Sequence, residues 1–319
     1  MKIVLPGPLA SELESRVRTI APDAPIVYFD EQNRPLGDVS DATILLRWWG
    51  APAALAALVE PMRALRWLHI PRAGVDSSLV QPVLERDIII TNSAGVHATP
   101  IAEWVLLFML SHVKQVPALL RAQAERAWAG GGKLQLDELA GKTLLVIGMG
   151  QIGQAIATRA TAFGVRVWGS SRSGRPVEGV ERVVAGTQWR ALLGEADFVV
   201  IAAPLTPETR TMFGAEELAA MKPTGYLINI ARGEIIHEQA LIDTLRTSSI
   251  AGAALDVFAQ EPLPEESPLW ALPNVFATPH ISWNSPHVRP RTLALFLDNL
   301  RRFVAGEPLV NRVDKDAGY

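Results

Sequence analysis

The chain has 319 residues, 49% of them hydrophobic and 20% charged, so it can bury a sizeable core and has the length of about two domains. The net charge of −3, without a run of basic residues, argues against a nucleic-acid partner. The absence of cysteine excludes disulfides, thiolate metal sites and a cysteine nucleophile.

No membrane or export segment is expected from the sequence. The longest apolar stretch, near Ile101 to Leu110, contains Glu103 and is shorter than the roughly 20 residues of a membrane span. The first residues resemble a buried strand rather than a signal peptide. We therefore expect a cytoplasmic protein with no membrane partner.

The first part of the chain alternates short aliphatic strands with helical patterns such as Pro52–Glu60. This alternation is typical of a parallel sheet whose strands are joined by crossover helices. The strands are expected at Lys2–Leu5, Ile26–Tyr28, Thr43–Leu46, Trp67–Ile70 and Ile88–Thr91, each bounded by Pro, Gly, Asp or Asn.

A second series of strands follows an apolar helix at Ile101–Val113, which is long enough to link two domains. A last helix, about Arg289–Val304, either completes a separate second domain or folds back onto the first, and the charged end at Asp314–Asp316 is expected to fray. The prediction is an α/β chain with two parallel-sheet domains. Its second series of strands is expected at Thr143–Ile147, Val165–Trp168, Phe198–Ile201, Tyr226–Asn229, Gly252–Asp256 and Val275–Ala277.

A glycine-rich turn joins the buried strand Thr143–Ile147 to a helical pattern that runs from Gln154 to Phe163. Gly148 permits a tight turn, Gly150 lets the backbone approach a pyrophosphate, and Gly153 lets the helix pack close to the strand. A glycine-rich turn without a ligand is the alternative. The strand and helix on either side favour a dinucleotide site.

The next strand ends in Ser170-Ser171-Arg172-Ser173, where a site for NAD usually has an acid that binds the ribose hydroxyls. A carboxylate would repel a 2′-phosphate, whereas Ser171 and Arg172 can bind one through charge-assisted hydrogen bonds. Alternatively, Arg172 is a solvated loop residue. The missing acid favours NADP(H) over NAD(H).

Three further strands end in polar residues that suit catalysis, namely Arg232, Glu261 and His280. Ligands of open parallel sheets bind beyond the carboxyl ends of the strands, so the three residues are expected at one edge. Each residue alone is more often a surface ion-pair partner, a loop carboxylate or a solvated imidazole. Their joint occurrence favours one site, and the other histidines are too scattered to indicate a metal centre.

Together with the glycine turn, these segments resemble the D-isomer-specific 2-hydroxyacid dehydrogenase family over nearly the whole chain. Arg72–Asp76 resembles the family's substrate-carboxylate loop, and Ser93–Gly95 and Ile101–Trp104 resemble its domain crossover. The resemblance implies a discontinuous substrate-binding domain (residues 1–94 and 283–319), a Rossmann-like, dinucleotide-binding domain (residues 95–282), a hinge cleft between them, and a homodimer. The serine-arginine segment is similar to that of NADP-dependent glyoxylate and hydroxypyruvate reductases.

The resemblance also implies a role for each residue. Arg232 would bind the carboxylate of a 2-keto acid and polarise its carbonyl group, and His280 would protonate the oxygen after hydride attack. Glu261 would orient the imidazole and favour its protonated form. The amides of Ala73 and Gly74 would hold the carboxylate. Further cofactor contacts are implied for Gln151, Ile152, Ser173, Ala203, Pro204, Thr209, Ile230, Ala231 and Asp256, the last of which could equally be structural.

The side-chain pocket is expected near Trp48 and Trp283, which would close over a small substrate or stack on an aromatic one. Alternatively, Trp48 and Trp49 pack in a domain core and Trp283 faces the hinge. Glyoxylate, hydroxypyruvate, phenylpyruvate and branched 2-keto acids all stay open as substrates. A formate- or phosphite-oxidising dehydrogenase, a dinucleotide-gated binding module like the C-terminal-binding-protein corepressors, and a non-catalytic member of the family are the competing hypotheses.

Overall fold

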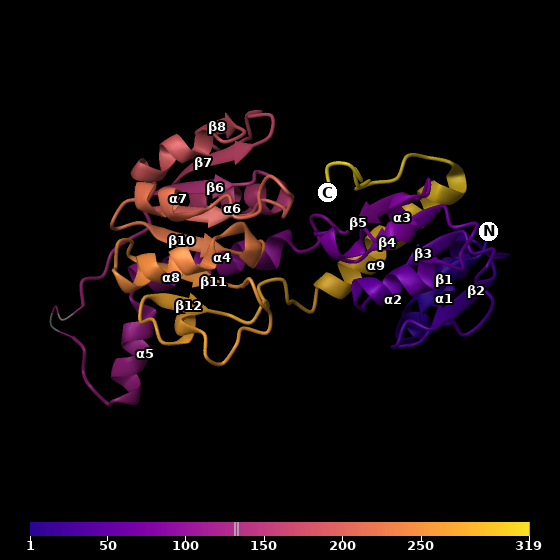
Figure 1. Ribbon diagram of the computed structural model, residues 1–319, viewed down its shortest axis with the longest axis horizontal. Coiled ribbons are helices and arrows are strands. Elements are labelled where there is room, and N and C mark those ends of the chain that lie inside the picture. Colours follow the sequence, from indigo (N-terminus) through magenta and orange to yellow (C-terminus); the bar gives the residue numbers. More distant parts are fainter. Residues whose placement is uncertain (131, 133, 319) are drawn as a thin grey trace. The chain divides into compact units, whose positions relative to one another are not determined.

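The computed structural model describes residues 1–130, 132 and 134–318 (Figure 1). Contacts divide the chain into two compact units. The first unit combines Met1–His97 with Ser285–Tyr319, and the second is Ala98–Asn284. Each unit has a parallel sheet of its own with helices on both faces, which confirms the expected α/β class.

The sheet of the first unit has five parallel strands in the order β2-β1-β3-β4-β5. Successive strand residues point to opposite faces. Ile3 and Leu5 therefore pack in one cluster with α1 and α9, whereas Val4 packs on the other side with α2. The elements are β1 Ile3–Pro6, η1 Gly7–Leu9, α1 Ala10–Ile20, β2 Ile26–Phe29, β3 Ile44–Leu46, α2 Pro52–Val59, β4 Trp67–Ile70, η2 Asp76–Ser78, α3 Gln81–Leu84, β5 Ile89–Asn92 and α9 Val288–Ala305.

The helix α9 belongs to the first unit, although the whole second unit precedes it in the sequence. Its Phe296 stacks on Trp67 of β4 with ring centroids 5.4 Å apart. The chain after α9 also contacts the sheet region, and Lys315 donates hydrogen bonds from Nζ to the carbonyl oxygens of Val83 (3.1 Å) and Arg86 (2.6 Å). The expectation that 314–316 frays was therefore wrong at Lys315, because its ammonium group is bound to backbone.

The sheet of the second unit has seven parallel strands in the order β12-β11-β10-β9-β6-β7-β8. Leu144 and Val146 of β6 pack against α4 and α6, whereas Leu145 and Ile147 pack on the opposite face, where α7 and α8 lie. The elements are α4 Ala98–Val113, α5 Val116–Ala124, β6 Thr143–Ile147, α6 Gln151–Ala162, β7 Arg166–Ser171, β8 Arg182–Ala185, η3 Gln188–Glu195, β9 Phe198–Ile201, α7 Ala215–Ala220, β10 Tyr226–Asn229, η4 Gly233–Ile235, α8 Glu238–Arg246, β11 Gly252–Leu255, η5 Pro268–Trp270 and β12 Val275–Ala277.

The edge strand β8 and the helix α5 are among the elements of this unit that were not expected from the sequence. The helix after the glycine turn also begins at Gln151, earlier than the expected Gln154. Among the described residues, no single helix has the length and apolarity to cross a membrane. Only α4 and α5 taken as a pair, bent by 67°, meet those criteria.

Candidate active site

The glycine turn after β6 is shaped by two close backbone approaches. Gly148 has φ +107°, and a Cβ there would lie 2.6 Å from the backbone of Ala202. A Cβ on Gly153 would lie 2.2 Å from the carbonyl oxygen of Gly148. Both positions therefore need glycine for the fold itself.

Gly150 differs from the other two glycines of the turn. It is the N-cap of α6 with φ −75° and ψ −165°, a backbone conformation open to any residue, and a Cβ there would meet nothing within 4 Å. The protein itself thus gives no reason for glycine at this position. Free space in front of the N-terminus of a 12-residue helix suits a pyrophosphate, so the turn fits a dinucleotide.

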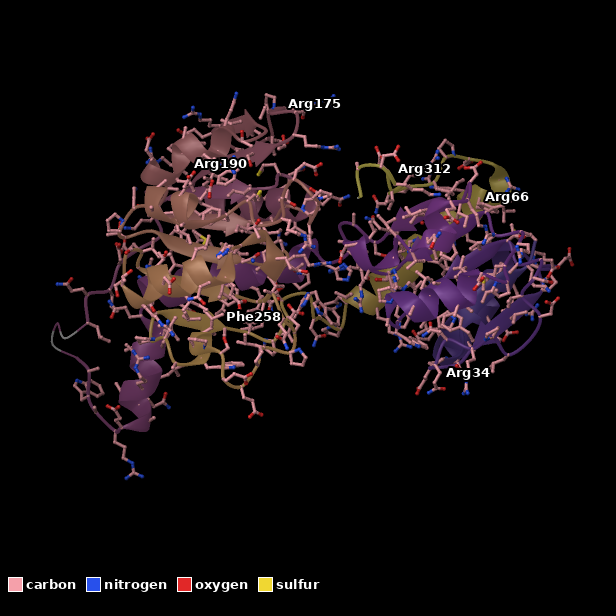
Figure 2. All side chains as sticks on the ribbon, in the orientation of Figure 1. Arg34, Arg66, Arg175, Arg190, Phe258 and Arg312 are labelled. Atoms are coloured by element: carbon pink, nitrogen blue, oxygen red, sulfur yellow. The ribbon has the colours of Figure 1, made fainter. Side chains whose placement is uncertain are left out.

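The end of β7 carries the predicted 2′-phosphate site. Ser171 pairs with Ala185 of β8, and its Oγ accepts a hydrogen bond of 3.1 Å from the amide of Gly174. Arg172 and Ser173 follow on the exposed turn, and no acidic residue lies between Arg166 and Arg175. Arg175 extends from this edge of the unit (Figure 2). Hydroxyl and guanidinium groups are thus the polar side chains here.

The remaining predicted cofactor residues follow neighbouring strands. The strands β6, β9 and β10 are adjacent in the sheet, so the segments after their carboxyl ends share one edge. Thr209 closes the turn after β9, because its Oγ1 donates to the carbonyl of Pro204 at 2.7 Å and accepts from the amide of Thr206 at 2.7 Å. Gln151 and Ile152 open α6, Ala203 follows β9, and Ile230 and Ala231 follow β10.

His280 and Glu261 are joined by a hydrogen bond, with 2.7 Å between Nδ1 and Oε2. The side chains are 38% and 36% exposed, so both can be reached from solvent. Burial alone would raise the pKa of Glu261. The hydrogen bonds from His280 and from the Phe258 amide, together with the positive charges of His280 and Arg232, outweigh burial and lower its pKa. Glu261 is therefore an ionised partner for the imidazole.

Arg232 lies in the turn after β10, and its charge acts on Glu261. The turn is held by the buried side chain of Asn229, whose Nδ2 donates to the Arg232 carbonyl (2.9 Å) and whose Oδ1 accepts from the Ala231 amide (3.1 Å). A Cβ on the next residue, Gly233, would lie 1.9 Å from the backbone of Phe258. The Arg232 turn therefore packs directly on the loop that leads to Glu261.

Asp256 holds the loop of His280 in a similar way. It is fully buried at the end of β11, and its carboxylate accepts hydrogen bonds from Thr278 Oγ1 (2.6 Å), the Ile281 amide (2.9 Å) and the Ser282 amide (3.0 Å). His280 lies between these contacts with φ +53°. This geometry supports the structural alternative for Asp256, because its carboxylate oxygens are already engaged within the protein.

The predicted substrate residues are divided between the two units. Trp283 is 42% exposed in the second unit and donates from Nε1 to the carbonyl of His280 at 2.8 Å. Trp48 is partly buried in the first unit against the cluster that contains α1 and α9. Ala73 and Gly74 form a loop after β4, and the carbonyl of Ala73 accepts a 2.8 Å hydrogen bond from Asn92 Nδ2.

The structure brings Arg232, Glu261 and His280 together at the carboxyl edge of the second sheet, the same edge at which the glycine turn follows β6. It adds Asn229, which sequence reasoning missed. The available signal was Asn229 itself, a polar residue at the end of the otherwise apolar strand Tyr226–Asn229. Among the described residues, no cluster of His, Asp and Glu has a metal-binding arrangement.

Comparisons with known proteins decide the family. A model of the D-isomer specific 2-hydroxyacid dehydrogenase, NAD binding domain, matches residues 106–282. A glyoxylate reductase of Korarchaeum cryptofilum is 33% identical over 288 residues, 87% of each chain. This chain belongs to the D-isomer specific 2-hydroxyacid dehydrogenase family. The matched segment lies within the second unit and includes the glycine turn, so a nicotinamide cofactor is the group that this unit binds.

Solved structures of the family extend the similarity to both units. A family member from Xanthobacter autotrophicus Py2, in complex with NADPH and MES, superimposes with a TM-score of 0.86 at 31% identity, over 100% of this chain and 99% of that one. An NADPH-dependent glyoxylate/hydroxypyruvate reductase from Sinorhizobium meliloti, in complex with NADP and sulfate, gives 0.85 at 32% identity with the same coverage. The similarity therefore includes the discontinuous first unit.

Proposed function

We propose that this member of the family reduces small 2-keto acids to D-2-hydroxy acids, with NADPH as the hydride donor. The observation that carries the proposal is the 2.7 Å contact between His280 Nδ1 and Glu261 Oε2, on which the charge of Arg232 also acts. Relatives named as glyoxylate or glyoxylate/hydroxypyruvate reductases support the substrate class.

His280 is the proton donor of the proposed reaction. When the cofactor is bound, it supplies the hydride that attacks C2 of the keto acid. Negative charge then develops on the carbonyl oxygen, and an acid within hydrogen-bond reach must neutralise it. Because Nδ1 is held by Glu261, Nε2 is the nitrogen that gives up the proton. In the direction of oxidation the same nitrogen accepts it.

Arg232 binds and polarises the substrate. Its planar guanidinium group presents parallel donors that match a carboxylate and a neighbouring carbonyl oxygen. The side chain is half-buried, and one Nη1 contact of 2.8 Å to the Ala231 carbonyl steadies it. This proposal assigns Arg232, Glu261 and His280 to the reacting end of the substrate.

The first unit is proposed to hold the rest of the substrate. Backbone amides of Ala73 and Gly74 would bind the carboxylate, and Trp48 would contact the side chain of the substrate. Trp283, which the contacts place in the second unit, is proposed as a further substrate contact. The assignment follows the family's arrangement of a substrate-binding domain, residues 1–94 and 283–319, and a dinucleotide-binding domain, residues 95–282. Indole contacts of this kind suit a small keto acid such as glyoxylate or hydroxypyruvate.

NADP(H) is the proposed cofactor in preference to NAD(H). Ser171 Oγ and the guanidinium group of Arg172 offer donors to a 2′-phosphate, and no carboxylate near them would repel it. The bound NADPH and NADP in the two solved relatives support this preference.

We also propose that the protein forms a homodimer through α5 and its neighbours. The helix α5 projects from the body of the second unit (Figure 1), and none of its residues is buried. Exposed apolar side chains of the helix, such as Leu119 and Leu120, suit an association surface. The neighbouring segments of the chain expose Leu107 of α4 and, after α5, Trp128 and Leu136. Light scattering of the purified chain, repeated with Leu120→Glu, tests the dimer.

The activity is tested by following oxidation of NADPH and NADH at equal concentrations with glyoxylate, hydroxypyruvate and phenylpyruvate. The proposal expects turnover with at least one keto acid and a higher kcat/KM for NADPH. Absence of turnover with every keto acid would contradict it and favour a binding module. Reduction of NADP by formate or phosphite alone would instead indicate the other dehydrogenase classes.

A further inference from the structure

Arg47 is a buried cation in the first unit, directly after β3. It is 5% exposed. Its guanidinium group donates from Nη1 to the carbonyl of Ser77 (3.1 Å) and to the hydroxyl of Ser78, and from Nη2 to the carbonyl of Gly50 (2.8 Å). Among the described residues, its hydrogen-bond acceptors are thus neutral oxygens and not a carboxylate.

A guanidinium group in this position is costly for the fold. The pKa of Arg47 is lowered to about 10, chiefly by burial and also by the charge of Arg72, whereas the charge of Asp76 opposes both effects. Buried charges are normally paired with an opposite charge, because desolvation is otherwise poorly compensated. A neutral side chain would fill the same space at a lower desolvation cost. We therefore look for the role of Arg47 in its hydrogen bonds.

These bonds join two loops that are about 30 residues apart in sequence. Gly50 lies in the loop after β3, which also contains Trp48. Ser77 and Ser78 lie in η2, just after the loop of Ala73 and Gly74. The strands β3 and β4 are neighbours in the sheet, so both loops leave the same edge. One side chain thereby fixes the spacing between the loops.

Among the described residues, the hydrogen bonds that join these two loops all come from Arg47. Trp49 is bound back to the segment after β2, with its Nε1 donating to the Glu31 carbonyl at 2.9 Å and its ring 5.7 Å from that of Phe29. The loop after β4 is bound on its other side by β5, through Asn92 Nδ2 and the Ala73 carbonyl. Each loop is thus tied to a different neighbour, and Arg47 ties the two together.

We propose that Arg47 is a positioning residue that sets the distance between Trp48 and the amides of Ala73 and Gly74, and with it the size of 2-keto acid that the pocket selects. The inference rests on the proposed function, because it assigns these two loops to the substrate. Arg47 itself does not touch the substrate in this proposal. It acts through the loops that do.

Two variants test the proposal, Arg47→Lys and Arg47→Met. Lysine keeps the charge but cannot bridge three acceptors in a fork geometry, and methionine removes both charge and donors. For both variants we expect the KM for the preferred keto acid to rise about 10-fold, with kcat within about 2-fold and the KM for NADPH unchanged. The ratio of kcat/KM for phenylpyruvate to that for glyoxylate should shift by about 5-fold or more, since pocket size changes.

Arg86→Met is a matched control. Arg86 also donates from its guanidinium group to two carbonyl oxygens of the first unit, those of Val59 and Met62, but at a distance in the fold from both loops. A general loss of stability should affect Arg86→Met and Arg47→Met alike. Unchanged KM and selectivity in both Arg47 variants, or the same changes in Arg86→Met, would overturn the proposal.

Amide hydrogen exchange provides a readout that does not depend on activity. In Arg47→Met, protection should fall together in residues 48–50 and 73–78, while the strands β3 and β4 keep theirs. Loss of protection in one loop alone, or in neither, would contradict the proposed positioning role of Arg47. If the wild-type protein reduced no keto acid, the proposed function would fail, and the exchange result would still decide whether Arg47 sets the loops.

Discussion

Gly150→Ala should weaken cofactor binding without harming the fold. A Cβ at this position meets nothing within 4 Å, and φ −75° with ψ −165° is allowed for alanine. Replacing glycine where the native backbone suits alanine stabilises a protein by about 0.4–1 kcal/mol through the unfolded state. Gly150 is also the N-cap of α6, where alanine is less favourable than glycine by a similar amount, so the two effects offset and the Tm should stay within about 2 °C of wild type.

The same methyl group would occupy the space where the pyrophosphate approaches the backbone. Losing one charge-assisted hydrogen bond costs about 1.5–3 kcal/mol, which weakens the Kd for NADPH by about 10-fold to 100-fold. Calorimetric titration with NADPH gives the Kd, and thermal unfolding without cofactor gives the Tm. We therefore expect a protein about as stable as wild type that binds its cofactor less well.

Gly153→Ala is the matched control, because it makes the same chemical change three residues later. Its Cβ would lie 2.2 Å from the Gly148 carbonyl oxygen, so the helix must shift. Overpacking of this kind costs about 1–3 kcal/mol, and the Tm should fall by about 2–12 °C. If Gly150→Ala lowered the Tm as much as Gly153→Ala, or bound NADPH as tightly as wild type, the reasoning about free space at Gly150 would be wrong.

Three further substitutions test the site. His280→Ala should lower kcat for keto acid reduction by about 100-fold or more, and a rate like that of wild type would remove His280 from the mechanism. Ser171→Asp should shift the ratio of kcat/KM from NADPH toward NADH, because a carboxylate repels the 2′-phosphate; an unchanged ratio would contradict the cofactor proposal. Glu261→Gln should reduce stability at pH 7, and the difference from wild type should vanish as the pH falls well below about 4.5, since the lowered pKa of Glu261 favours the folded state only while the carboxylate is ionised. A destabilisation measured by urea unfolding that persists unchanged at low pH would argue against the ion pair.

Most strands were predictable because each is a short aliphatic run buried on both faces between helices. The segments Thr143–Ile147 and Phe198–Ile201 have the bounds expected from the sequence. The edge strand β8 was missed because it pairs on one side only and includes exposed and half-buried residues. The helix α5 was missed because none of its residues is buried within this chain, so burial left no pattern to detect.

The residues of the site that directly follow a strand could be predicted from the sequence. Arg232 and His280 each follow a strand of the second sheet, and the carboxyl ends of parallel strands lie at a common edge. The role of Arg47 was beyond reach, because its acceptors at Ser77 and Ser78 are 30 residues away and only the fold brings them close. The local sequence shows which residues follow a strand. It does not show which distant loop will accept a hydrogen bond from them.

The catalytic loops of the second unit are held by buried polar groups at the ends of two paired strands. Asn229 bonds the turn of Arg232, Asp256 bonds the loop of His280, and the amide of Asp256 donates to the carbonyl of Asn229 at 3.0 Å. Loops are ordinarily the mobile part of a fold, whereas catalysis needs the reacting groups held in a productive geometry. Asn229 and Asp256 are fully buried and their polar groups are hydrogen-bonded. The positions of the two loops are therefore fixed by the spacing of the strands beneath them. The geometry of the proposed active site is therefore set beneath its surface, by residues that touch neither substrate nor proton.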